Sequence, residues 1–391
     1  MFTSFLFCMA SCDLKRSKNI NEKDTNTSQV ENQSSLLLPP PDWTKNLIIY
    51  EINPYAYTSP NGAGDGGGSG TFKSLSHKLD YLRDLGINGI WLAGFNEVTK
   101  HFHNIPTVYA SRMPHVIDSR LGNSDDFRDL IRKGHEKGIR FFLDVVTHGV
   151  VKESPLVKEH PDWFYGESWG MMDYDYDHEE FKEWWINLWV NYVKEYKIDG
   201  FRLDGPNGVA PKDKVLAVWY TIVERCAEIG YPILVFPENA SLHFKQGGRD
   251  TELFEKNLAE KFSPSPEYKC RAVSNHDSGH YQEGGKSYYR LNGSRFVFGY
   301  VYIFGYDIPL FMSGEEFWAD YVPLPDAQKD LFGGGGPSAW LYASWIQWDQ
   351  LNDRLKSDML EDCKKIIRIK NENSDLIHYN RSETNIIEIP D

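Results

Sequence analysis

Three short strand-like segments of this 391-residue chain each end in an acidic residue. The first, Ile198–Asp204, reads Ile-Asp-Gly-Phe-Arg-Leu-Asp and predicts a short buried strand. Because alternate residues of a strand share a face, Arg202 should lie beside Asp204 and lower the pKa of its carboxyl group. An ionised carboxylate at the end of a strand suits a catalytic nucleophile. The alternative is an Arg–Asp pair that only stabilises the strand end, and this segment alone does not decide between the two.

Glu238 and Asp277 end the other two segments, Ile233–Glu238 and Ala272–Asp277. Glu238 has no basic neighbour within its segment, so we expect it to keep a proton and to act as an acid. Two carboxyl groups that flank a glycosidic bond, one ionised and one protonated, are the minimum for glycoside hydrolysis. Each residue alone could be a structural ion-pair partner. Three of them in order, each at a predicted strand end, favour catalysis.

These carboxyl groups can meet only if the strands that carry them run in parallel. Strand-like apolar runs alternate with stretches of helical periodicity, which predicts a parallel sheet covered by helices. The predicted strands are 47–52, 88–92, 140–146, 198–204, 233–238, 272–277 and 308–312, and a final amphipathic helix covers roughly 355–371. Polar residues at strand C-termini are typical of a (β/α)8 TIM barrel, an α/β fold. An open doubly wound sheet is less favoured because no Gly-x-Gly-x-x-Gly turn follows the first strand. The sixth barrel strand is poorly marked.

The motifs at these strand ends resemble those of the α-amylase family of glycoside hydrolases, family 13. The matching segments are Asp144-Val-Val-Thr-His148, Gly200-Phe-Arg-Leu-Asp204, Phe236-Pro-Glu-Asn239 and Ser274-Asn-His-Asp277. The resemblance runs over about residues 42–380 and implies a (β/α)8 barrel.

The resemblance also implies a role for each matching residue. Asp204 would be the nucleophile, Glu238 the general acid/base and Asp277 the transition-state stabiliser. Arg202 would orient Asp204. The sugar at the cleavage point would be bound by further residues, namely His148 and His276 through its hydroxyl groups and Tyr109 by stacking.

The activity implied is that of a retaining α-glycoside hydrolase, which acts on α-glucans or maltooligosaccharides through a covalent glycosyl-enzyme. One alternative is a catalytically inactive family member that binds sugar or serves as a scaffold. Another is an α-glucan transglycosylase, since water and a sugar hydroxyl compete for the same intermediate. The chain keeps all three carboxylates, which favours an enzyme over an inactive relative. An oligo- or polysaccharide is therefore the expected partner.

Several departures from the family pattern bear on cofactor and substrate. Thr147 stands where the family usually has an asparagine that ligates calcium, and a hydroxyl is the weaker ligand, so no metal or other cofactor is predicted. Gly205-Pro206-Asn207-Gly208 replaces a Lys-His pair that often lines the next subsite, which leaves the choice of α-glucan open.

Two regions are expected to be shorter than in the family. Residues 149–176 form a short excursion after the third strand. Its Trp163, Phe164 and Trp169 are either sugar platforms or packing residues of the excursion itself. The C-terminal β-domain is expected to be truncated or missing, because residues 376–391 leave room for about one strand.

The N-terminus differs in composition from the rest of the chain. Residues 1–12 are apolar and then small, and Met9-Ala10-Ser11-Cys12 resembles the end of a bacterial lipoprotein signal with Cys12 as the lipidated residue. Residues 13–36 are mostly polar, which predicts a disordered tether over 13–40 before a barrel over 41–375. We therefore expect a cell-envelope protein that meets the membrane only through a lipid anchor. A frayed apolar terminus is the alternative. The net charge of −14 argues against nucleic acid as a partner.

Overall fold

The computed structural model describes residues 38–59, 69–100, 106–206, 212–238, 270–272, 276, 308–323 and 344–379. They belong to one compact unit, Leu37–Asp391. The predicted signal segment with Cys12, the predicted tether up to residue 37, and the predicted stabiliser Asp277 lie outside the described residues.

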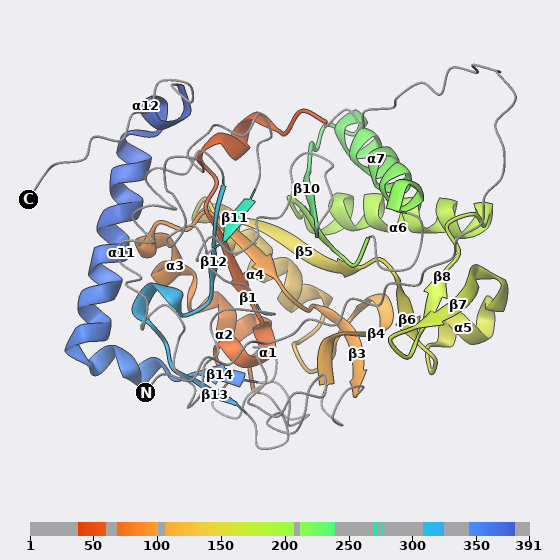
Figure 1. Ribbon diagram of the computed structural model, residues 1–391, viewed down its shortest axis with the longest axis horizontal. Helices are drawn as coiled ribbons and strands as arrows, with labels where there is room; N and C mark the ends of the chain where they lie inside the picture. Colours follow the sequence, from red (N-terminus) through yellow and green to blue (C-terminus); the bar gives the residue numbers. More distant parts are fainter. Residues whose placement is uncertain are drawn as a thin grey trace, which may run out of the picture. The chain divides into compact units, whose positions relative to one another are not determined.

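A parallel sheet of seven strands forms the centre of this unit (Figure 1). Its strands are β1 (Ile49–Ile52), β2 (Gly89–Leu92), β5 (Arg140–Val146), β9 (Gly200–Asp204), β10 (Leu234–Pro237), β11 (Cys270–Ala272) and β12 (Ile308–Met312). The spatial order is β10-β9-β5-β2-β1-β12-β11, and every pair is parallel. The first strand, β1, therefore pairs with the last, β12, as in a barrel. The stretch between β10 and β11, where the sixth strand is expected, lies outside the described residues.

The strand β9 shows how the sequence separates the two faces of the sheet. Phe201 faces the helices, with its ring centroid 5.4 Å from that of Trp189 and 5.0 Å from that of Trp219. Arg202 faces the interior of the sheet and is also buried. Gly200 is required where β9 and β10 approach each other, because a Cβ there would lie 1.8 Å from the Leu234 carbonyl oxygen.

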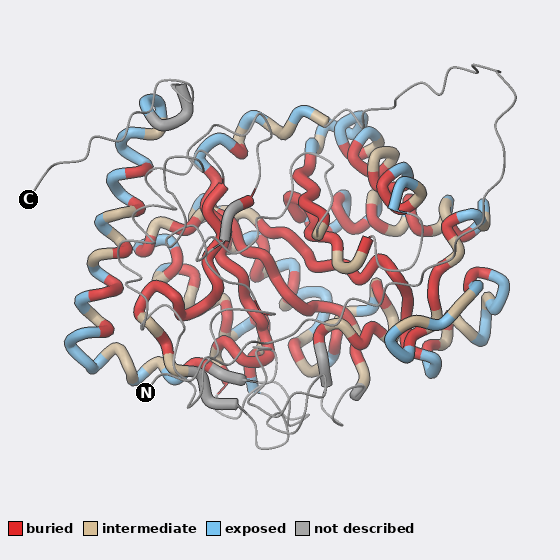
Figure 2. Tube along the Cα trace, viewed as in Figure 1, coloured by how far each residue is buried: buried red, intermediate tan, exposed pale blue. Residues whose placement is uncertain are grey.

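Amphipathic helices cover the outer face of the sheet. The long ones are α4 (Ser124–Glu136), α6 (Glu179–Tyr196), α7 (Lys212–Glu228) and α11 (Arg354–Glu372). The shorter ones are α1 (Pro54–Tyr57), α2 (Phe72–Ser76), α3 (Leu79–Leu85), α5 (Pro155–Glu159) and α12 (Ser374–Tyr379). Figure 2 shows buried residues along the strands and on the inner sides of these helices. None of the helices in the described part of the chain is long and apolar enough to cross a bilayer.

Smaller antiparallel elements extend from the loops that follow the strands. After β2 comes the hairpin of β3 (Asn96–Lys100) and β4 (Pro106–Ile117). The predicted excursion holds a three-stranded sheet of β6 (Gly149–Val151), β7 (Phe164–Ser168) and β8 (Met171–Tyr174), in the order β6-β8-β7. Near the C-terminus, β13 (Tyr321–Pro323) pairs with β14 (Ser344–Ile346). Short 3-10 helices complete the described elements, at η1 (Asp42–Asn46), η3 (Pro161–Trp163), η6 (Glu315–Phe317) and η10 (Trp348–Asn352).

Two of the three aromatic residues singled out in the excursion are packing residues. Trp163 is 2% exposed and stacks on His160, with ring centroids 3.8 Å apart. Phe164 is buried too and stacks on Tyr174. Neither ring can serve as an open sugar platform.

Candidate active site

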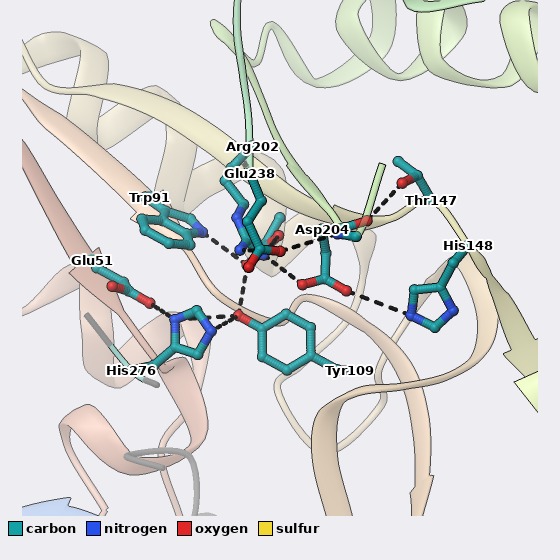
Figure 3. Close-up of polar contacts among 11 residues, drawn as sticks. Glu51, Trp91, Tyr109, Thr147, His148, Arg202, Asp204, Glu238 and His276 are labelled. Carbon is teal, nitrogen blue, oxygen red and sulfur yellow. Dashed lines mark hydrogen bonds and ion pairs between the residues drawn. The ribbon is translucent and has the colours of Figure 1, made fainter. Parts of the chain in front are cut away.

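A single buried arginine joins the acidic residues at the C-terminal ends of the parallel strands (Figure 3). Arg202 is 1% exposed, and its Nη1 donates to Asp204 Oδ1 at 2.8 Å and to Asp144 Oδ1 at 3.0 Å. Its Nη2 lies 3.0 Å from Glu238 Oε2. Three carboxyl groups from β9, β5 and the end of β10 therefore share one guanidinium. A planar group with several donors is suited to this arrangement, whereas an ammonium ion is not.

Asp204 is held as an anion at the mouth of the sheet. Burial opposes its ionisation, but the charge of Arg202 and the neighbouring His148 side chain outweigh burial and lower the pKa of Asp204 to about 2. His148, just beyond β5, places its Nε2 3.6 Å from Asp204 Oδ2. The prediction that Arg202 and Asp204 share a strand face and form an ion pair is confirmed by their contact.

Asp144 lies beneath Asp204 and completes the shell around Arg202. It accepts hydrogen bonds from Trp91 Nε1 at 3.0 Å and from the Tyr109 hydroxyl at 2.9 Å. Burial raises the pKa of Asp144 to about 6, and the neighbouring charge of Arg202 partly opposes this rise. Asp144 is thus a buried positioning group rather than one exposed to substrate.

Glu238 follows β10 and faces the same mouth. Its own segment holds no basic residue, but across the sheet it pairs with Arg202 of β9, and it also accepts from the Gly205 backbone N–H at 3.1 Å. The side chains of Glu238 and Asp204 are 27% and 16% exposed, whereas those of Arg202 and Asp144 are 1% and 2% exposed. The two predicted reacting groups are therefore open to a ligand, and the groups that orient them are not.

His276 and Tyr109 form the other wall of the site. The Tyr109 hydroxyl lies 2.8 Å from His276 Nε2, and its ring lies beside the Asp204 carboxylate in Figure 3. On its other side, His276 Nδ1 bonds to Glu51, a fully buried residue in the middle of β1. Burial, with the adjacent charge of Asp144, raises the pKa of Tyr109 well above its usual range, so the phenol stays neutral.

Thr147, at the position where the family usually has asparagine, is hydrogen-bonded within the protein. Its hydroxyl donates to the Asp204 backbone carbonyl at 2.6 Å, and its own carbonyl oxygen accepts from the Tyr176 hydroxyl at 2.8 Å. Among the residues that the structure describes, no three His, Cys, Asp or Glu side chains gather where they could hold a metal ion.

The structure therefore brings together all the predicted substrate and catalytic residues that it describes: Tyr109, His148, Arg202, Asp204, Glu238 and His276. Four further groups belong to the site but were not predicted from the sequence: Glu51, Trp91, Asp144 and the backbone N–H of Gly205. The signal that could have found Glu51 is a charged residue inside the otherwise apolar run Ile48–Ile52.

Comparison with known proteins shows which family this chain resembles. A family model described as the α-amylase catalytic domain matches residues 55–168. An intracellular maltogenic amylase of Bacillus subtilis is 28% identical over 208 residues, which cover 43% of this chain and 34% of that protein. A cyclomaltodextrinase of Geobacillus thermopakistaniensis is 26% identical over 215 residues, or 44% of this chain and 36% of the relative. The matches support an α-amylase family catalytic domain. The matched region is thus similar to glycoside hydrolases of that family.

Solved structures extend the likeness in fold beyond the region matched in sequence. A maltogenic α-amylase from Thermotoga neapolitana superposes with a TM-score of 0.61 at 21% identity, over 83% of this chain and 77% of its own. An α-amylase from Geobacillus thermoleovorans gives a TM-score of 0.61 at 16% identity, over 84% and 79%. These likenesses imply that the described parallel sheet is part of a TIM barrel. The chain spans about a third of the length of the curated relatives it matches.

Proposed function

We propose that this α-amylase family domain is a retaining α-glycoside hydrolase that acts on α-glucans or maltooligosaccharides. One observation carries the proposal: Arg202 holds Asp204 and Glu238 together at the ends of adjacent strands, and only these two carboxyl groups of the cluster are open to a ligand. The maltogenic amylase and cyclomaltodextrinase among the relatives support the class of substrate.

In the first step, Asp204 attacks the anomeric carbon while Glu238 gives its proton to the glycosidic oxygen. The bond between that carbon and the oxygen breaks, and the leaving sugar departs with the proton. A covalent ester joins the remaining sugar to Asp204, and Glu238 is left as a carboxylate. Arg202 favours this step because it keeps Asp204 ionised and aimed. The roles of His148, His276 and Tyr109 are to bind the sugar at the cleavage point.

In the second step, the Glu238 carboxylate takes a proton from water, and the resulting hydroxide attacks the anomeric carbon. The ester bond to Asp204 breaks, so the sugar leaves with the α configuration and Glu238 regains its proton. A sugar hydroxyl in place of water would give transglycosylation by the same steps. Asp277 is assigned to stabilise the oxocarbenium-like transition state.

The test is the configuration of the first-formed product. Proton NMR during digestion of maltooligosaccharides should show the α-anomer before mutarotation, and Asp204→Asn should abolish turnover while the protein stays folded. Glu238→Gln should retain activity only on substrates whose leaving group needs no protonation. A β-anomer, or an Asp204→Asn variant with near-normal turnover, would contradict the proposal.

We propose further that the protein is a lipoprotein of a bacterial envelope, anchored through Cys12. The apolar start, the Met9–Cys12 pattern and the polar stretch that follows support this. Mass spectrometry of native material should find a lipidated Cys12 at the mature N-terminus and ready proteolysis before Pro39. An unprocessed N-terminus with an unmodified Cys12 would refute it.

A further inference from the structure

The third aromatic residue of the excursion, Trp169, differs from its buried neighbours. Its exposed fraction is 52%, against 2% for Trp163 and 8% for Phe164. It lies in the two-residue turn between β7 and β8, which is closed by the pairing of Ser168 with Met171. The excursion therefore does not use this large ring to build its own core.

The backbone at this turn is one that a tryptophan does not favour. Trp169 has φ 51° and the following Gly170 has φ 75°, so both residues of a two-residue hairpin turn are left-handed. Turns of this kind strongly prefer Asn-Gly, Asp-Gly or Gly-Gly. A bulky residue held in such a conformation is a reason to look for a function, because folding alone does not select it.

The position of the Trp169 ring indicates what this function is. Trp169 lies edge-on against His148, with ring centroids 4.9 Å apart and an angle of 75° between the planes. His148 is in turn 3.6 Å from the Asp204 carboxylate. Only one side chain thus separates the half-exposed indole from the predicted nucleophile.

An indole beside a glycosidase nucleophile suits one kind of ligand. The C–H groups on the face of a pyranose ring are apolar, and a large flat ring with an apolar body can stack on them. Because His148 is assigned to the sugar at the cleavage point, the unit nearest to Trp169 is the next one along the glucan chain.

We propose that Trp169 is a carbohydrate-stacking residue that binds the glucose unit adjacent to the cleaved one. It makes the site selective for oligosaccharides over single glucosides. The substrate class in this inference rests on the proposed function.

Calorimetric titration of maltoheptaose into the Asp204→Asn protein tests the inference without turnover. Adding Trp169→Asn, which creates an Asn-Gly turn, should weaken binding by about tenfold or more and leave the melting temperature unchanged or higher. Adding Trp169→Tyr should preserve most of the affinity. The matched control is Tyr165→Ala, because Tyr165 is 53% exposed on the same hairpin; it should leave binding within twofold.

The outcomes separate this inference from the proposed function. Unchanged affinity in the Trp169→Asn variant, an equal loss in the Tyr165→Ala variant, or no binding of maltoheptaose at all would overturn the role of Trp169. Trp169-dependent binding in a protein whose wild type hydrolyses no glucan would leave the inference standing and reject the hydrolase. If Trp169→Asn unfolds the hairpin, Trp169→Gly takes its place, since glycine accepts either sign of φ.

Discussion

Replacing Arg202 by methionine removes the one cation that three carboxyl groups share. The expected change in the pKa of Asp204 follows from the structure. Its pKa is lowered from 3.8 to about 2 in the folded protein. At about 1.36 kcal/mol per pKa unit, the folded site favours the ionised form by roughly 2.5 kcal/mol. Without Arg202, burial becomes the dominant influence, and it raises the pKa. We therefore expect the acid limb of kcat/KM to move from near pH 2 to above about pH 4.

The assay is the pH dependence of kcat/KM, which reports ionisations of the free enzyme. The same substitution should lower the free energy of unfolding by about 3–5 kcal/mol, because it leaves buried carboxylates without a counter-ion. Arg202→Lys keeps the charge but not the planar fork, so its acid limb should move less than that of the methionine variant.

A matched control lies at the opposite end of β5. Arg140 binds Asp199 at 2.7 Å, and that aspartate is as buried as Asp144. Arg140→Met removes an arginine from a buried carboxylate far from the site, so it should destabilise the protein without moving the acid limb. A folded Arg202→Met enzyme whose acid limb stays near pH 2, or an equal shift in the Arg140→Met variant, would refute the reasoning.

Three further predictions follow from the shell around this cluster. Asp144 has a pKa raised from 3.8 to about 6, so between these values the folded state binds a proton that the unfolded state lacks. Stability should therefore fall by roughly 3 kcal/mol as pH rises through this window, and denaturant melts of Asp144→Asn should show a flatter profile. Gly205 has φ 56°, and a Cβ there would lie 3.0 Å from His148 Cδ2. Gly205→Ala should thus be about 1–2 kcal/mol less stable by thermal melting and lose kcat/KM, whereas normal kinetics would show that the loop relaxes. Because the Thr147 hydroxyl is a weaker calcium ligand than an amide oxygen, EDTA should barely change activity or melting temperature. A large chelator-induced loss that calcium restores would show that other oxygens complete a metal site.

Those strands that are apolar on both faces could be read from the sequence. The runs 140–146 and 308–312 match β5 and β12 residue for residue, because both are mostly apolar and, apart from the first residue of β5, buried. The final helix, predicted at 355–371, extends over Arg354–Glu372, since its apolar spacing is regular and Asp353 caps its start.

The partners within the site could not be read in the same way, because they depend on the register between strands. Arg202 and Asp204 are two residues apart on one strand, so their contact follows from periodicity alone. The contact between Arg202 and Glu238 instead depends on the pairing of Phe236 with Arg202 across β9 and β10. A motif holds no information on that pairing, so the contact between Arg202 and Glu238 could not be predicted from the sequence.

The pairing of β1 with β12 has a consequence for biosynthesis. Ile49 is bonded in register with Leu310, a residue made 261 positions later. At about 5–20 residues per second, the ribosome exposes β1 roughly 13–50 s before its partner exists. Throughout that interval the edge of β1 that later pairs with β12 is open to pairing with other strands or other chains. The nascent chain is thus most prone to aggregation while it is still being translated, and holding factors that shield β1 should raise the yield more than any factor that acts after release.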